Sequence, residues 1–204
     1  MTRWEPNARE RLEKAAMELY RERGFDETAV ADIAARAGLT ERTFFRYFAD
    51  KREVLFGGAS ALQDLLTSQI AGAPASLGPL DAVAAAFEAT TTLFEERRPF
   101  AKARLAIITG HPALLERELI KLAVLATAIA AALRDRGVPE PAATLAAESG
   151  IAIFKLAFER WVTDTKKRDL ALHVREALEQ LKAVTAGQAK GPAAAGLKSS
   201  RRGR

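Results

Sequence analysis

Apolar residues recur at helical spacing along most of the chain. Between residues 7 and 23, one face of a helix would collect Leu12, Ala15, Ala16, Leu19 and Tyr20. Similar patterns predict short helices at residues 28–37 and 40–48, and longer ones at residues 51–70, 80–97, 99–109, 112–136, 141–164 and 169–184. No stretch alternates in the way that a half-buried strand does. The pattern therefore predicts an all-α protein.

The second and third predicted helices are joined by a turn with clear stop and start signals. Gly38 suits the left-handed backbone position that ends a helix, and Thr40 suits the N-cap of the next one. Small Ala34 and Ala37 would let the two helices approach closely. Together these features form a helix-turn-helix pattern. Further along, Asp50 is expected to cap the helix that begins at residue 51.

The third predicted helix lies in the segment TERTFFRYFADK, residues 40–51, which concentrates rings and guanidinium groups. Phe44 and Phe48 are four residues apart and should point inward together. The opposite face combines charges with one ring: Glu41, Arg42, Phe45 and Arg46. Such a face suits the DNA major groove, where arginine makes bidentate contacts with guanine. Lys51 would meet a phosphate.

The composition narrows the class of protein. The chain has 204 residues, of which 49% are apolar, and no cysteine, so disulfides and thiolate metal sites are excluded. With only His111 and His173 as further ligand candidates, we expect no metal and no cofactor. The longest near-apolar run, residues 122–133, is too short to span a bilayer, and the N-terminus lacks a secretory signal pattern. These features predict a soluble cytoplasmic protein that does not engage a membrane.

The net charge of +5 is concentrated at the C-terminal end. Residues 187–204 hold five of the 31 cationic side chains and none of the 26 acids, so the rest of the chain is formally neutral. Any argument for nucleic-acid binding must therefore rest on local features. We expect residues 187–204 to be a disordered basic tail.

The segment GFDETAVADIAARAGLTERTFFRYFADKREVLF, residues 24–56, resembles the tetracycline-repressor (TetR) family of bacterial transcriptional regulators. The resemblance implies that Thr40, Glu41, Arg42, Thr43 and Arg46 occupy recognition-helix positions that contact bases and phosphates. It implies further that two aromatic residues lie along the DNA backbone and that one lysine binds phosphate: Phe45, Tyr47 and Lys51.

Two positions depart from the family pattern. Phe45 stands where the family usually has tyrosine, so a hydroxyl contact is lost. Ala29 stands where threonine or serine often caps the second helix, so either Thr28 caps it or that end is weaker by about 1 kcal/mol. Thr28 completes the predicted DNA-binding set.

The same resemblance implies a helical ligand-binding and dimerisation domain after the helix-turn-helix. We expect a DNA-binding domain over residues 1–51, an effector-binding and dimerisation domain over residues 52–186, and then the tail. Residues 97–137 resemble, more weakly, the C-terminal domain of mycofactocin-system regulators, which hints at hydrophobic or acyl-thioester effectors. The candidates for the effector pocket are Phe87, Thr91, Phe94, Arg98, Phe100, Arg104, Ile107, Ile108 and Phe154.

Two of these expectations have plain alternatives. Arg104 could hold an anionic group of a ligand, or it could pair with a glutamate such as Glu148 or be exposed to water. The apolar, small-residue stripe on residues 141–164 could cross a dimer interface or fill the core of one chain. The candidates for the dimer interface are Gly150, Ala157, Phe158, Trp161, Val174 and Leu178.

The function expected from the sequence is sequence-specific transcriptional regulation. A homodimer would bind a palindromic operator in double-stranded DNA and be released by a small-molecule effector. The chain shows no catalytic motif, so we do not expect an enzyme. The rival hypothesis is a ligand-binding or scaffold protein whose helix-turn-helix no longer binds DNA. This alternative stays open because helix-turn-helix geometry also occurs in proteins that do not bind DNA.

Overall fold

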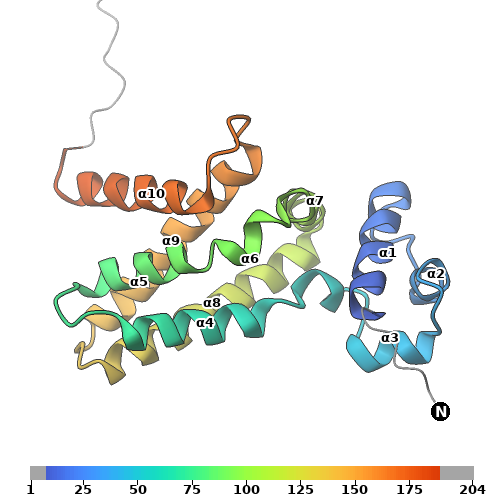
Figure 1. Ribbon diagram of the computed structural model, residues 1–204, viewed down its shortest axis with the longest axis horizontal. Helices are drawn as coiled ribbons and strands as arrows, with labels where there is room; N and C mark the ends of the chain where they lie inside the picture. Colours follow the sequence, from blue (N-terminus) through green and yellow to red (C-terminus); the bar gives the residue numbers. More distant parts are fainter. Residues whose placement is uncertain (1–7, 189–204) are drawn as a thin grey trace, which may run out of the picture.

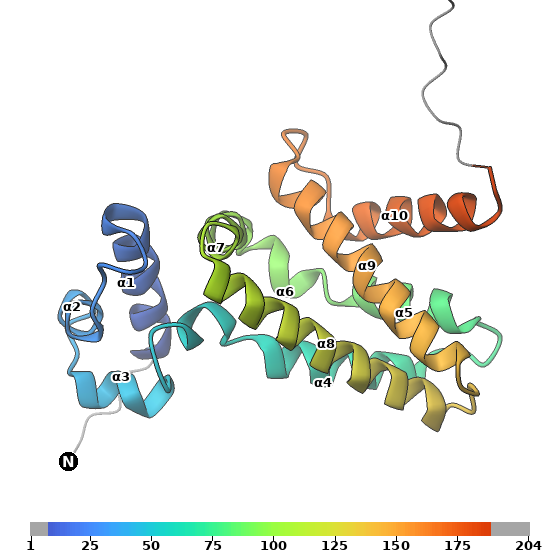
Figure 2. The ribbon, with the colours of Figure 1, turned by 180° about the vertical axis from the view of Figure 1, so that it is seen from behind.

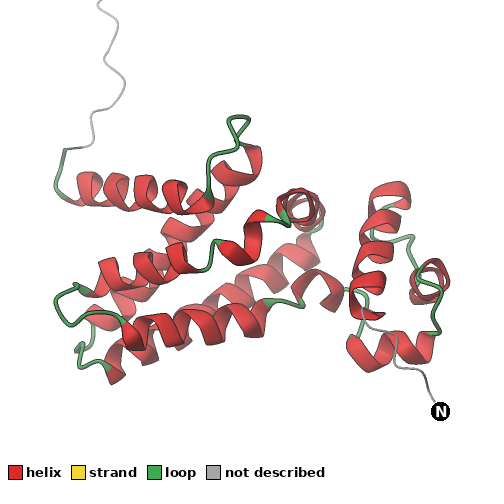
Figure 3. Ribbon diagram, viewed as in Figure 1, coloured by secondary structure: helices red, strands yellow, loops and turns green. Residues whose placement is uncertain are grey.

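The computed structural model describes residues 8–188, and every regular element in that range is a helix (Figure 3). This confirms the prediction of an all-α protein. Most of the predicted tail, residues 189–204, lies outside the described part of the chain. Within residues 8–188, no helix is long and apolar enough to cross a membrane.

Three helices form one end of the molecule: α1 (Ala8–Arg23), α2 (Val30–Arg36) and α3 (Glu41–Tyr47) (Figure 1). A 3-10 helix, η1 (Glu53–Phe56), leads from them into the rest of the fold. The larger part contains α4 (Ala59–Gly72), α5 (Pro79–Ala89), α6 (Thr92–Glu95), α7 (Arg98–Thr109), α8 (Pro112–Asp135), α9 (Ala142–Thr163) and α10 (Leu170–Thr185).

Helix α9 is the centre of the larger part, because it packs against α5, α8 and α10. Helices α4 and α8 run side by side, as Figure 2 shows from behind. Helix α7 links the two parts of the molecule, since it contacts α1 as well as α8 and α9. The prolines at positions 79, 99 and 112 lie in the first turns of α5, α7 and α8, where a missing N–H costs little.

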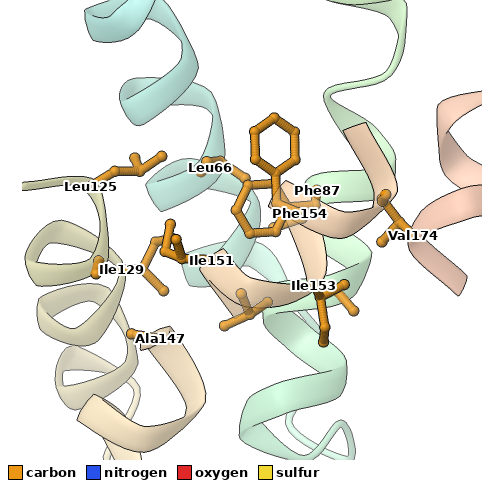
Figure 4. Close-up of a cluster of buried hydrophobic side chains, with 14 of the residues drawn as sticks. Leu66, Phe87, Leu125, Ile129, Ala147, Ile151, Ile153, Phe154 and Val174 are labelled. Carbon is orange, nitrogen blue, oxygen red and sulfur yellow. The ribbon is translucent and has the colours of Figure 1, made fainter. Parts of the chain in front are cut away.

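Two separate hydrophobic clusters hold this arrangement together. The larger one lies among α4, α5, α8, α9 and α10, and Figure 4 shows its side chains converging, among them Leu66, Phe87, Ile129, Ile151 and Val174. The second cluster surrounds the helix-turn-helix, but it also contains Ile107, Ile108 and Leu114 from α7 and α8. The N-terminal helices therefore share their core with the domain that follows them.

Two predicted helices are interrupted in the structure. The helix expected over residues 51–70 is divided into η1 and α4 by Gly57 and Gly58. Asp50 does supply a cap, but to η1: its Oδ1 accepts from the backbone amides of Arg52 and Glu53 at 2.8 and 3.1 Å. Two consecutive glycines disfavour a continuous helix here, since each loses much backbone entropy in a helix interior.

The helix expected over residues 80–97 ends at Ala89 and resumes as the single turn of α6. At the break, the buried hydroxyl of Thr90 donates to the carbonyl oxygen of Phe87 at 2.7 Å. Threonine competes in this way for backbone acceptors, and three threonines stand in succession at residues 90–92. That local competition gives a physical reason for the break.

Candidate nucleic-acid interface

The turn between α2 and α3 is built from the residues that the sequence singled out. Gly38 adopts a positive φ of 66°, and its amide donates to the carbonyl of Ala35 at 3.0 Å. The next amide, of Leu39, donates to the carbonyl of Ala34 at 2.8 Å, so both of these carbonyls in the last turn of α2 are satisfied. Thr40 caps α3, because its Oγ1 accepts from the amide of Thr43 at 3.2 Å. Both predicted signals are confirmed.

Helix α3 has one buried and one exposed face, as predicted. Phe44 is fully buried and Phe48 nearly so, with ring centroids 5.4 Å apart. Glu41, Arg42, Phe45 and Arg46 are exposed on the other face. Phe45 keeps 54% of its surface exposed, while its ring lies edge-to-face against Phe44 at 5.5 Å. The exposed face of α3 therefore combines charged groups with one accessible aromatic ring.

Arg46 and Tyr47 contact each other on this surface. The guanidinium carbon of Arg46 lies 4.9 Å from the centroid of the Tyr47 ring, and Nη2 donates to the tyrosine hydroxyl at 3.2 Å. Stacking on an aromatic ring restricts the arginine side chain to a few positions. The two residues therefore form one unit, in which the charge of Arg46 stays at the exposed edge of α3.

Lys51 has a different environment from the one expected of a free phosphate-binding lysine. Its Nζ donates to the carbonyl oxygens of Phe25, Asp26 and Thr28 at 2.8, 3.0 and 2.9 Å. An ammonium group has three protons, so these three acceptors use all of them. Lys51 thus ties the α1–α2 loop to the end of the helix-turn-helix, and its contact with phosphate stays a prediction that requires one of these bonds to exchange.

A buried tyrosine supports the same region. The hydroxyl of Tyr20 donates to the carbonyl of Lys51 at 2.6 Å, and burial, together with the nearby Asp50 carboxylate, raises the pKa of this phenol. Tyr20 stays neutral and acts as a hydrogen-bond donor. The sequence pattern identified it only as a core residue of α1, because its acceptor lies 31 positions away.

The start of α2 differs from the sequence expectation. Ala29 is the N-cap residue, and its amide donates to the carboxylate of Asp32 at 3.4 Å. Thr28 is fully buried, and its hydroxyl donates to the carbonyl of Gly24 at 2.8 Å. Of the two alternatives from the sequence, capping of α2 by Thr28 is therefore not the one observed, because its hydroxyl is turned into the preceding loop. Thr28 was also predicted to contact DNA, but its side chain is buried in this structure.

The residues expected to line an effector pocket fall into two groups. Phe87, Phe94 and Phe154 belong to an aromatic cluster with Phe158 and Trp161, in which the rings of Phe87 and Phe154 stack at 4.7 Å. Ile107 and Ile108 pack in the other core, against the helix-turn-helix. Phe100 also packs there, as a partly buried side chain. Thr91 lies at the break between α5 and α6. The structure does not gather these residues around one cavity.

Both candidate arginines are held by the protein itself. Arg98 donates through Nη2 to the carbonyl oxygens of Trp161 and Asp164, and its guanidinium lies 5.0 Å from the Trp161 ring. Arg104 makes a bidentate pair with Glu118, with distances of 3.1 and 2.7 Å, and also donates to the carbonyl of Leu55. An intrachain glutamate partner for Arg104 was the alternative from the sequence, although Glu118 takes the role suggested for Glu148.

One polar atom in the aromatic cluster has no partner. The indole Nε1 of Trp161 is buried and makes no hydrogen bond within the described residues. A surface depression of about 470 Å³ lies elsewhere, between α4 and α8, and is lined by Asp64, Thr67, Ser68, Ala71, Ala132, Asp135 and Arg136. None of the predicted effector residues lines it. Among residues 8–188, no group of three or more histidines and acids is positioned to hold a metal ion.

The predicted dimer residues lie inside the chain. Ala157, Trp161 and Val174 are fully buried, Leu178 is nearly so, and Phe158 is partly buried against the larger cluster. Gly150 lets α9 approach α5 so closely that a Cβ atom there would lie 2.3 Å from the side chain of Val83. The small-residue stripe therefore fills the core of one chain, the alternative left open by the sequence. Exposed apolar side chains occur instead at Leu145 and Leu156 of α9 and at Leu115, Leu119, Ile120 and Val124 of α8.

Comparisons with known proteins identify both parts of the chain. Residues 12–56 match the model of bacterial regulatory proteins of the tetR family, and residues 77–186 match the model of the MftR C-terminal domain. The regulator TcmR of Streptomyces glaucescens is 37% identical over 81 residues, which cover 40% of this chain and 36% of TcmR. A proposed mycofactocin biosynthesis regulator, MftR of Mycobacterium tuberculosis, is 31% identical over 103 residues, 50% of this chain and 52% of MftR. The matched segments thus span about a third to a half of the length of these two relatives.

Solved structures with the same fold extend over nearly the whole chain. A proposed transcriptional regulator from Pseudomonas aeruginosa aligns with a TM-score of 0.62 at 18% identity, covering 91% of this chain and 94% of that one. The tetR-family repressor FadR of Thermus thermophilus, solved with lauroyl-CoA, aligns with a TM-score of 0.50 at 24% identity, covering 92% and 98%. At these identities the likeness shows the fold alone.

Proposed function

The chain belongs to the tetR family of bacterial regulatory proteins, and we propose that it acts as a homodimeric repressor. In this proposal, two copies of α3 bind a palindromic operator, and a small apolar or acyl-type molecule releases the protein from DNA. The observation that carries the proposal is the exposed face of α3, where charged groups and a ring surround a helix fixed from behind by buried Phe44 and Phe48.

This face has the chemistry that reading of a major groove requires. Arg42 and Arg46 can each donate two hydrogen bonds to guanine or bind phosphate, and Phe45 can contact a thymine methyl group. Glu41 can accept from the amino group of cytosine. The first turn of α3, from which Glu41 and Arg42 project, is the part of a recognition helix that meets base edges.

The proposed dimer provides the area and spacing that one short helix lacks. Two recognition helices about 34–36 Å apart read successive turns of the major groove on one face of DNA. Because the small-residue stripe of α9 is used within the chain, we assign the dimer surface to the exposed side of α9. Leu145 and Leu156, three helical turns apart, lie on that side.

The proposed effector site is the aromatic cluster. Its rings offer apolar contacts, and the unpartnered indole N–H of Trp161 offers one hydrogen bond to an acceptor on the ligand. Partly buried Phe94 and Phe158 form the side through which a ligand would enter. The lauroyl-CoA bound by the T. thermophilus repressor makes acyl thioesters the first ligands to screen.

Fluorescence anisotropy tests the proposal, with the purified protein, its own upstream DNA, a scrambled duplex and two salt concentrations. If that DNA lacks the operator, selection from a random duplex pool supplies one. We expect tight binding to one duplex and weak, salt-sensitive binding to the scrambled one. Arg46→Glu should lose at least about tenfold in affinity, since a charge-assisted contact becomes a repulsive one. Lys166→Glu, on the exposed α9–α10 loop, makes the same change in charge and should bind like the wild type.

The rival hypothesis of a protein that has lost DNA binding predicts a different result. Equal, weak binding to every duplex, unchanged by Arg46→Glu, would contradict the proposed repressor and favour the ligand-binding or scaffold protein. Catalysis is not part of the proposal, because the matched relatives are transcriptional regulators.

A further inference from the structure

Residues 94–98 contact several distant parts of the molecule within one short segment. The ring of Phe94 lies 5.7 Å from that of Phe158 and 6.4 Å from that of Trp161, so the segment starts in the aromatic cluster. The carboxylate of Glu95 accepts from the amide of Leu170 at 2.8 Å and thus caps the start of α10. The two arginines that follow contact two further regions.

Arg97 reaches into the N-terminal core. Its Nη2 donates to the carboxylate of Glu13 at 2.6 Å, and Glu13 is a buried residue of α1. The same carboxylate accepts from Arg9 at 3.2 Å, and Arg9 also donates to the carbonyl of Gly57 at 2.6 Å. Arg9 and Arg97 thus bind the two oxygens of one buried carboxylate, and the second of these bonds connects Arg97 to α1. The Phe100 ring, 4.4 Å from the guanidinium, restricts Arg97 further.

Arg98 turns toward the opposite part of the fold. It donates to the carbonyl oxygens of Trp161 and Asp164, at the C-terminal end of α9, where the helix dipole favours a cation. Two consecutive arginines thus hold α1 on one side and α9 on the other. Any displacement of the segment must change both sets of contacts, because one peptide bond separates the two residues.

We infer that residues 94–98 form the link through which a ligand in the aromatic cluster moves the DNA-binding domain. The Arg97–Glu13 ion pair is the contact through which this link reaches α1. The inference rests on the proposed function and adds its route. A ligand that displaces Phe94 moves Arg97, which binds Oε2 of the Glu13 carboxylate while Arg9 binds Oε1. The Glu13 side chain is only 11% exposed, so a shift of Arg97 changes the balance between these two partners and biases the position of α1.

Linkage makes the inference testable without an identified ligand. If the cluster influences DNA binding, DNA binding must influence the cluster to the same extent. The chain has two tryptophans, Trp4 and Trp161, so Trp4→Phe leaves one indole in the cluster as a reporter. In that background, titration with the operator duplex should change the emission of Trp161, while labelled DNA in the same samples reports the affinity.

Arg97→Gln should abolish most of the emission change and alter operator affinity by no more than about threefold. Phe94→Leu, which loosens the other end of the link, should have the same effect. The matched control is Arg134→Gln, because Arg134 forms an exposed 2.6 Å pair with Glu140 that does not reach the N-terminal helices. It should leave the emission change intact.

Three outcomes would overturn the inference. The first is an emission change that survives Arg97→Gln, and the second is operator binding without any emission change in the Trp4→Phe protein. In both, measured DNA binding would leave the proposed function standing. The third is failure of the Trp4→Phe protein to bind any selected duplex, which would remove the proposed function and this inference together. Glu13→Gln is the second variant: combined with Arg97→Gln, it should add no further loss of the emission change.

Discussion

The helix-turn-helix and the larger helical domain both combine hydrophobic packing with bonds from side chains to backbone carbonyls, but they differ in how the helices are positioned. In the former, side chains bind backbone carbonyls across the turns: Thr28 to Gly24, Lys51 to three loop carbonyls and Arg11 to Ala37. In the latter, α9 packs on its neighbours through small residues and stacked rings, at Gly150 against Val83 and Phe154 against Phe87. A small unit buries too little apolar surface for packing alone to fix its geometry. Directional bonds supply that precision where α3 must be presented to DNA.

Lys51→Met tests the directional bonds and should have the largest effect. It keeps most of the length of the side chain but removes the ammonium group that donates to three carbonyls, so we expect the free energy of unfolding to fall by about 3 kcal/mol. Urea denaturation measures this loss. Arg52 is exposed and paired with Asp50, so Arg52→Met should lower the free energy of unfolding by less than about 1 kcal/mol. Equal costs for the two variants would contradict the structural role of Lys51.

Gly150→Ala tests the close packing of α9. The added methyl group overlaps Val83 at 2.3 Å, so we expect a loss of about 2 kcal/mol in the free energy of unfolding. Gly58→Ala serves as the control, since a Cβ there meets nothing within 4 Å. Sedimentation should show the same oligomeric state for both variants. Loss of the dimer in Gly150→Ala alone would instead indicate that Gly150 lies at the dimer interface.

The exposed ring of Phe45 allows a test of how α3 contacts DNA. Replacing operator thymines with deoxyuridine removes only methyl groups, so each contact with Phe45 that is lost should weaken binding roughly fourfold. The Phe45→Ala variant should be insensitive to the same replacement. Anisotropy with the two duplexes and two proteins completes a double-mutant cycle. A deoxyuridine effect of equal size in both proteins would assign the thymine contacts to another residue.

The smallest effect concerns the loop between α9 and α10 and its dependence on pH. A hydrogen bond from Arg168 lowers the pKa of Asp164 to about 2, with further bonds from the Lys166 amide and His173 outweighing the effect of burial. Since the unfolded chain has a pKa near 3.9, this carboxylate stabilises the fold above about pH 4 and loses that effect toward about pH 2. Urea midpoints should therefore fall less steeply in that range for Asp164→Asn than for the wild type.

An unchanged pH slope in Asp164→Asn would assign the acid sensitivity to other carboxylates. Asp64→Asn, an exposed change on α4, provides the matched control for the loss of one acidic group. Its urea midpoints should follow the wild type through the same range.

The sequence was most informative where structure is decided locally. Gly38, Thr40 and the Phe44–Phe48 spacing act within one or two turns, and the helix-turn-helix followed from them. The break at residues 90–91 depends on competition between backbone and side-chain bonds, and the split at Gly57 depends on glycine backbone entropy. Apolar spacing reveals neither. The partners of Arg97 and Arg98 lie 84, 63 and 66 positions away, so no local pattern could identify them. The stripe around Gly150 has the same appearance whether its partner helix belongs to the same chain or to another.

The shared N-terminal core has a consequence for building hybrid regulators. Ile107, Ile108 and Leu114 belong to the same buried cluster as residues of α1 and η1, and a fragment ending near residue 56 would lack them. A chimera that exchanges only this fragment would place foreign side chains against those three residues and create gaps or overlaps. Successful exchange of DNA specificity should instead graft the exposed face of α3 alone and leave every residue beneath it unchanged.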